Sequence, residues 1–288
     1  MWIDLIFYIA FFSQILLISY HYPKRILRRM DYIFEHCPAD QYTKLYPKGY
    51  KKTLEGKILY KLLNIIILII GIIIFVTFII ANQQGNIELK DMDFLPFAYG
   101  MLQAIPFLIL EVSALKQFKL MRSLNDQTKR KAELSPRSLF NYISPVRFFT
   151  AVIMFFVCTL AIFSFNDFKI SADMAVLIGS MILCNGLFFV LGYILLQGKK
   201  LDPYQSPEDR HKMITVVFRS YTSVSILVSV FFIINRCVDY YSMDNWEPLF
   251  NSLYWQCVVL MSTGTMLKLT KLEEVNYGVY KTNTSNHT

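Results

Sequence analysis

Glu111 is the only acidic or basic side chain that the sequence places well inside a long apolar segment. The segment, residues 94–115, is long enough to cross a bilayer, and a charge in the hydrocarbon costs from about 2.5 kcal/mol upward. Such a carboxylate either binds a cation, a proton or a substrate, or anchors its helix by pairing with a neighbour. Lys116 and Lys119 follow within two helical turns, which places Glu111 in the third of the membrane nearest to them.

Polar side chains recur at helical spacing in two further apolar segments, residues 213–235 and 248–267. Hydroxyl and amide groups in a membrane helix either hydrogen-bond to their surroundings as ordinary contacts between helices, or line a path that water can enter. The second alternative predicts a hydrated pathway between the third, sixth and seventh apolar segments. Its lining residues are Glu111, Gln103, Ser225, Ser229 and Gln256.

Four basic residues follow the first apolar segment: Lys24, Arg25, Arg28 and Arg29. At helical spacing they share one face of residues 24–36, and apolar side chains share the other. A basic amphipathic helix lies in the headgroup plane and attracts anionic lipid, with each basic residue contributing roughly 1 kcal/mol near the surface. The four residues are therefore predicted contacts for anionic lipid headgroups. The alternative is that they only anchor the topology of the chain.

Seven apolar segments account for most of the 288 residues, of which 55% are hydrophobic, with a mean hydropathy of +0.39. Each can cross a hydrocarbon core of roughly 30 Å as a helix. The prediction is an all-α polytopic membrane protein with one seven-helix domain over residues 1–268 and a short tail over 269–288. The predicted spans are 3–20, 62–81, 94–115, 146–165, 172–196, 213–235 and 248–267.

The charges predict the orientation of the chain. Of the 29 lysines and arginines, 26 lie in the segments 21–61, 115–147 and 197–219 or after residue 267. The three remaining connections carry one basic residue each and eight acidic ones between them. Because basic loops stay in the cytosol, we expect the N-terminus outside, the C-terminus in the cytosol and the protein in the cytoplasmic, inner or plasma, membrane. The net charge of +8 does not indicate nucleic acid as a partner, because the basic residues are distributed as cytosolic loops of a membrane protein require.

The composition of the spans predicts their places in the bundle. Residues 65–80 are apolar on every side, so this helix belongs at the periphery, whereas the polar last span should be enclosed by other helices. A small-residue face in the fifth span predicts close packing with another helix, through Ala175, Gly179 and Gly186. Serine–proline pairs predict helix starts at Ser135–Pro136 and Ser206–Pro207.

Residues that hold metals or cofactors are poorly placed in this sequence. All four histidines lie outside the predicted spans, and no two cysteines are spaced as a C-x-x-C pair. Transmembrane haem ligation and a zinc site are therefore not indicated, and neither a metal nor a cofactor is predicted. No phosphate-binding loop, nucleophile elbow or zinc-protease motif is present either.

Three functional hypotheses follow. The first is transport or permeation of a small solute or ion through the polar interior, with Glu111 as the proton- or cation-sensitive group. The second is a non-catalytic scaffold or sensing subunit that uses the basic cytoplasmic loops, with a membrane protein partner or as a homo-oligomer. The third is an enzyme that acts on lipid headgroups, and no motif in the sequence supports it.

Overall fold

The computed structural model describes residues 2–125, 138–198 and 200–282, and in these ranges it is helical without a strand. The predicted helix start at Ser135–Pro136 lies outside the described residues. The helices are α1 (Trp2–Leu16), α2 (Tyr22–His36), α3 (Tyr50–Gln83), α4 (Leu95–Ser123), α5 (Pro145–Phe165), α6 (Ala172–Gln197), α7 (Pro207–Tyr240), α8 (Glu247–Val259) and α9 (Thr265–Leu269).

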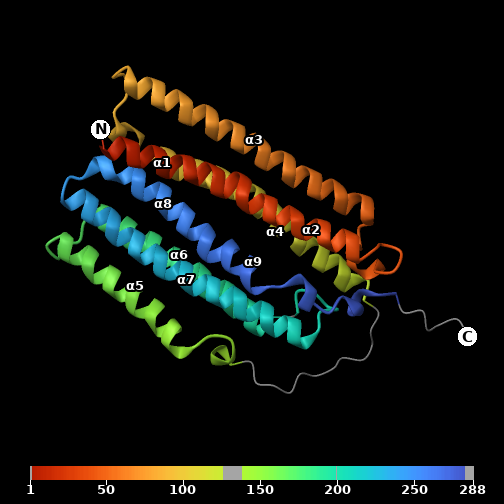
Figure 1. The fold of residues 1–288 in the computed structure, drawn as a ribbon. Helices are drawn as coiled ribbons and strands as arrows, with labels where there is room; N and C mark the ends of the chain where they lie inside the picture. The colour runs from red at the N-terminus through yellow and green to blue at the C-terminus, as the bar shows by residue number, and fades with distance from the viewer. Residues whose placement is uncertain (1, 126–137, 199, 283–288) are drawn as a thin grey trace, which may run out of the picture.

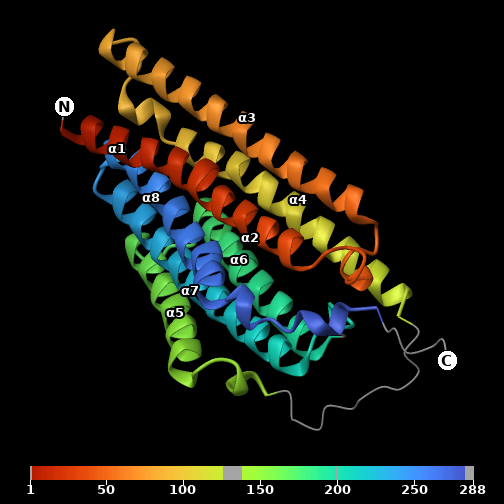
Figure 2. The ribbon, with the colours of Figure 1, turned by 45° about the vertical axis from the view of Figure 1, so that its right-hand side comes forward.

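The long helices form an elongated bundle with α3 at one edge and α5 at the other (Figures 1 and 2). One group consists of α1, α3 and α4, the other of α5, α6 and α7, and α8 packs between them against α1, α4 and α7. The apolar helix over residues 65–80 therefore lies at the periphery, as predicted, and the polar last helix is enclosed. We call the end of the bundle that carries α2, α9 and residues 270–282 the basic end.

Among the described residues, six helical segments are long and apolar enough to cross a membrane. The segment formed by α8, a π-helical turn (Leu260–Gly264) and α9 runs beside them, but its polar side chains lower its hydropathy below theirs. The structure thus supports an all-helical protein with six candidate spans, one fewer than the sequence predicts.

The first candidate span differs from the expectation at its end. A π-helical turn (Leu17–His21) joins α1 to α2 without a break, so that Trp2–His36 is one helical segment of 35 residues. At 1.5 Å per residue this segment is about 52 Å long, which exceeds a hydrocarbon core of roughly 30 Å. The helix α2, which carries the basic residues, therefore continues in the direction of α1 (Figure 1) and is not a separate helix lying across it.

Two local predictions have opposite outcomes. The start at Ser206–Pro207 is confirmed: the Ser206 hydroxyl accepts the backbone N–H of Asp209 at 3.1 Å, and α7 begins at Pro207. The predicted close packing of the small-residue face on α6 is wrong, because no atom of a neighbouring element in the described part of the chain lies within 4 Å of a Cβ built at Gly179 or at Gly186. Ala175, on the same face, is exposed as well.

The helix approaches its neighbours through a different face. Met174 and Met181 are buried against α5, and the ring of Phe218 from α7 packs on Gly192. The reason for the wrong prediction is that α6 turns this face, and not the row of small residues, toward the bundle.

Candidate functional site

Two glutamines hydrogen-bond to each other in the middle of the bundle. The Gln14 amide on α1 donates to the Pro96 carbonyl and to Gln103 Oε1 on α4, both at 3.1 Å. In return, the Gln103 amide donates to the Gln14 carbonyl at 3.3 Å and to the Ser19 hydroxyl at 2.9 Å. Both side chains are at most 1% exposed. Gln103 therefore faces α1 and not the space between α4, α7 and α8.

The same network continues to α3 through Tyr99. Its hydroxyl lies 3.4 Å from that of Ser19 and donates to the Ile67 carbonyl at 2.9 Å. A Cβ at Gly71 would collide with this hydroxyl, so the glycine is what allows the tyrosine to reach the backbone of α3. The network thus fixes three helices to one another.

Gln256 on α8 also faces α1. It accepts from the Ser13 hydroxyl at 3.0 Å and donates to the Ala10 carbonyl at 2.9 Å. The neighbouring Trp255 packs its ring on Gly100 of α4, where a Cβ would overlap the indole. We call the hydrogen-bonded residues on α1, the π-helical turn that follows it, α4 and α8 the amide layer: Ser13, Gln14, Ser19, Tyr99, Gln103 and Gln256.

The two serines of the predicted pathway lie elsewhere. The Ser225 hydroxyl on α7 donates to Asn185 Oδ1 on α6, and the buried Ser229 hydroxyl donates to the Ser225 carbonyl at 3.2 Å. Asn185 also donates to the Met181 carbonyl at 3.0 Å. These bonds tie α7 to α6 on the far side of α8, so they are not part of the amide layer.

Glu111 stands apart from both groups. It is exposed, and among the described residues it has an electrostatic interaction with Tyr221 of α7 but no hydrogen bond or ion pair. One turn earlier, the ring of Phe107 contacts that of Tyr60 at a centroid distance of 6.2 Å. Because α3 and α4 run in opposite directions, Glu111 lies closer to the basic end than Lys61 does. The five residues of the predicted pathway therefore do not line one common space.

Several buried polar atoms of the central helices remain without a hydrogen-bond partner among the described residues. They are Gln14 Oε1, Ser252 Oγ and Trp255 Nε1. Gln14 was not among the residues predicted from the sequence, although a lone amide inside an apolar segment is a usable signal, because an unpaired amide in lipid costs several kcal/mol.

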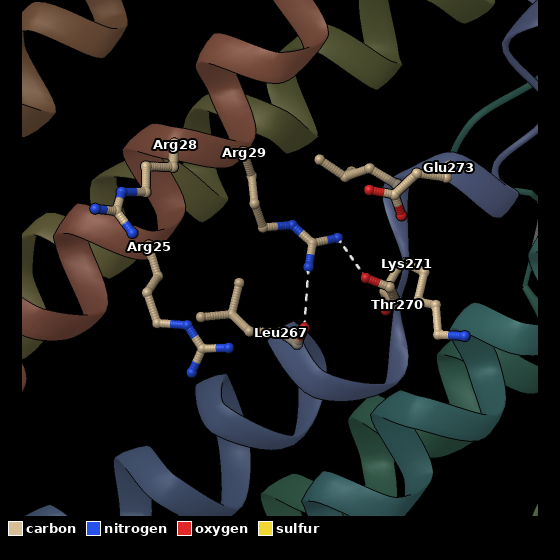
Figure 3. Close-up of a pocket in the computed structure, with 8 residues that line it drawn as sticks. Arg25, Arg28, Arg29, Leu267, Thr270, Lys271 and Glu273 are labelled. Carbon is tan, nitrogen blue, oxygen red and sulfur yellow. Dashed lines mark hydrogen bonds between the residues drawn. The ribbon is translucent and has the colours of Figure 1, made fainter.

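The basic end holds the four predicted lipid contacts. The Arg29 guanidinium donates to the carbonyls of Leu267 at 3.2 Å and Thr270 at 2.7 Å, where α9 ends (Figure 3). These carbonyls have no partner within the helix, so the arginine caps it. Lys24 donates to the Tyr20 hydroxyl at 3.1 Å, on its own helix. Arg25 and Arg28 have no hydrogen bond or ion pair among the described residues.

An open pocket of about 310 Å³ lies between α2 and the end of α9. Figure 3 shows the side chains of Arg25 and Arg29 extending toward Leu267 and Thr270, whereas that of Arg28 points the other way. Four of the lining side chains are basic and one is acidic. The full lining is Arg25, Arg28, Arg29, Leu267, Thr270, Lys271, Leu272 and Glu273. The structure thus brings three of the four predicted lipid contacts to one pocket.

Residues 270–273 form the other wall of this pocket, and they begin a segment, residues 270–282, whose place at the basic end the sequence did not indicate. The backbone N–H of Asn276 donates to Asp209 at 3.2 Å, and that of Thr282 donates to the Gln41 carbonyl at 3.0 Å. The Tyr280 hydroxyl donates to the buried Asp202, and burial raises the pKa of Tyr280 above its usual value. The segment therefore crosses the basic end and is held at three points.

The carboxylate of Glu274 on this segment pairs with two lysines, Lys271 at 3.0 Å and Lys212 at 3.6 Å. Its pKa is lowered, first by the hydrogen bond from Lys271. In the described part of the chain, no group of three histidine, cysteine or carboxylate side chains could hold a metal ion. The chemistry that this end offers is the binding of an anion by guanidinium groups.

Comparison with models of known protein families, with curated proteins and with solved structures gives no match to this chain.

Proposed function

We propose that the chain is a seven-span membrane protein with its N-terminus outside and its basic end in the cytosol. The segment from α8 to α9, residues 247–269, is about 34 Å long as a helix and can reach across a bilayer. Enclosure by α1, α4 and α7 allows it to carry the amides that lipid would not tolerate. The charge distribution supports the orientation, since 26 of the 29 basic residues then lie in the cytosol.

We further propose a non-catalytic function, that of a scaffold or sensing subunit which binds anionic lipid of the inner leaflet. One observation carries this proposal: none of the four basic residues of α2 is paired with a carboxylate in the described part of the chain. Basic side chains held unpaired at the membrane surface attract anionic headgroups.

A test is the lipid composition around the full chain in nanodiscs made from a mixture of phosphatidylcholine and phosphatidylserine. We expect enrichment of phosphatidylserine that declines with salt and is largely lost when Lys24, Arg25, Arg28 and Arg29 are all changed to glutamine. At roughly 1 kcal/mol per charge, each residue contributes about fivefold. The matched control changes four exposed lysines elsewhere to glutamine: Lys51, Lys52, Lys116 and Lys119. If the two variants lost phosphatidylserine enrichment equally, or if the α2 variant lost none, the proposed binding of anionic lipid by α2 would be contradicted.

Transport of a small solute or ion is the second candidate. The unpaired Gln14 Oε1, Ser252 Oγ and Trp255 Nε1 favour it, because buried polar atoms without partners are places where water or a solute can bind. The path would follow α1, α4 and α8 instead of α4, α7 and α8. Proteoliposome flux that stops when Gln14 is changed to leucine, in a chain that still folds, would establish this candidate over the first.

A further inference from the structure

Three guanidinium groups line the pocket at the basic end, and those of Arg25 and Arg29 extend toward its wall at Leu267 and Thr270, whereas that of Arg28 points the other way (Figure 3). Arg25 and Arg29 are one helical turn apart, and both side chains extend into the same space (Figure 3). The charge of Arg25 acts unfavourably on that of Arg29. Like charges at this spacing destabilise a helix, and an anion held between them removes the cost.

The Arg29 guanidinium is held in place by the protein itself. Its bonds to the Leu267 and Thr270 carbonyls fix the plane of the group, and an arginine has five N–H donors, so others remain available. Glu273 acts favourably on Arg29 and offsets part of its charge. Arg25 has no such partner among the described residues, which leaves its charge for a ligand.

The pocket has the size of a single chemical group or a small headgroup. Its volume of about 310 Å³ is at the lower end of the range of roughly 300–1,000 Å³ for ligand sites. Leu267 and Leu272 give it apolar walls, and the guanidinium groups give it planar donors. A guanidinium group can donate two parallel hydrogen bonds to two oxygens of a phosphate. Because a phosphate also has more oxygens and more charge than a carboxylate, it is the better ligand for two guanidinium groups.

We propose that this pocket binds one phosphate group, of a lipid headgroup or of a soluble phosphate, between Arg25 and Arg29. The inference rests on the proposed function for the position of the pocket at the inner membrane surface, and it adds a ligand and a defined site. The wall formed by residues 270–273 makes the site more than a basic surface, because that wall positions Arg29 and limits the space around it.

Arg25→Gln and Lys24→Gln are the variants that test the site. Each removes one exposed positive charge from the same helix, but of the two side chains only that of Arg25 lines the pocket beside Arg29. A general attraction to the membrane surface would be weakened equally, by about fivefold, in both variants. A phosphate bridged by two guanidinium groups predicts an additional loss of about tenfold or more for Arg25→Gln alone.

The measurement is native mass spectrometry of the full chain in detergent, titrated separately with short-chain phosphatidic acid and with inorganic phosphate. Thermal unfolding of each variant establishes that it folds. If Arg25→Gln selectively loses binding of phosphatidic acid but not of inorganic phosphate, the site is assigned to a lipid headgroup. A selective loss with inorganic phosphate as well assigns it to phosphate from either source.

Two outcomes overturn the proposal. Equal losses in the two variants would remove the pocket while leaving the lipid-binding function of α2 in place. The absence of binding by the unaltered chain to both probes would remove the site too, and the phosphatidylserine enrichment in nanodiscs then decides separately whether α2 binds lipid.

Discussion

The amide layer and the basic end are both polar, but they differ in how their polar groups are paired. In the amide layer, the side chains of Gln103 and Gln256 both donate and accept hydrogen bonds between helices. The Gln14 amide donates to α4, and Gln14 Oε1 is without a partner among the described residues. At the basic end, Arg25 and Arg28 have no hydrogen bond or ion pair among the described residues, and they line an open pocket. The amide layer is therefore expected to determine stability, and the basic end to determine binding.

This difference shows that polarity alone does not identify a site in a membrane protein. A buried amide must be paired because lipid offers no partner, so its bonds follow from the cost of burial. An arginine at the membrane surface is under no such requirement, because water and headgroups solvate it. Basic groups that remain close together without carboxylates therefore point to a ligand more directly than the amides do.

The largest effect on the amide layer is expected from Gly100→Ala. The new methyl group would overlap the indole of Trp255 and push α8 away from α4. Overpacking of this kind costs about 1–3 kcal/mol, measured as unfolding in detergent. Gly179→Ala is the matched control, because nothing lies within 4 Å of its Cβ position. Equal stability of the two variants would show that α4 and α8 are not in close contact.

Gln103→Leu is expected to have the next largest effect. The change leaves Gln14 and Ser19 without their shared partner, at a cost of about 1–2 kcal/mol of unfolding free energy. Gln83→Leu, at the exposed end of α3, should stay within about 0.5 kcal/mol of the unaltered chain. If lipid enrichment in nanodiscs fell in Gln103→Leu while the protein stayed folded, the amide layer would have a binding role and the division between the two regions would fail.

Glu111→Gln tests the residue from which the transport hypothesis started. Glu111 is exposed and lies toward the basic end of the bundle, nearer to it than Lys61 on the adjacent helix α3. We therefore expect Glu111→Gln to change the free energy of unfolding by less than about 0.5 kcal/mol. Proton permeability of proteoliposomes, followed with an internal pH dye, should be unchanged as well. A fall in permeability would instead assign a proton-conducting role to this carboxylate and favour the second candidate function.

The order of the helices could be predicted from the sequence, because the lengths of apolar segments and the positions of prolines are local features. The start of α7 at Pro207 and the enclosure of α8 by other helices are two features that were predicted in this way. The rotation of each helix could not be predicted, because it depends on neighbours far away in the chain. Gln103 was assigned to a path beside α7, yet it faces α1, and Gly192 is the close contact of α6 instead of Gly179.

The candidate site was predictable only in part. The basic residues of α2 stand out as a cluster, so the anionic partner could be proposed from the sequence. The wall of the pocket could not, because residues 270–282 show no helical periodicity and their partners, such as Asp202 and Gln41, lie more than 70 positions earlier in the chain. The pairing of Arg29 with the end of α9 is likewise a tertiary feature.

A further prediction concerns Tyr46, which shows that part of the basic end is buried and hydrogen-bonded as the amide layer is. Its hydroxyl donates to the Cys37 carbonyl at 2.8 Å, and burial, with smaller effects from Cys37 and Tyr50, raises the pKa of Tyr46 to about 12. An unfolded tyrosine has a pKa of about 10, so the fold favours the neutral hydroxyl. Its stabilising contribution is complete below pH 10 or so and is lost as the pH rises toward about 12.

Ultraviolet difference titration of the unaltered chain against Tyr46→Phe should therefore show one late-titrating tyrosine, and the variant should lose about 1 kcal/mol of stability at neutral pH. Tyr20→Phe is the control variant. The Tyr20 side chain is exposed, and its hydroxyl accepts a hydrogen bond from Lys24 on the surface of the protein. Ionisation of Tyr46 near pH 10 would mean that the segment between α2 and α3 opens readily. The basic end would then be loose throughout, and the unpaired arginines would no longer distinguish one part of it as a site.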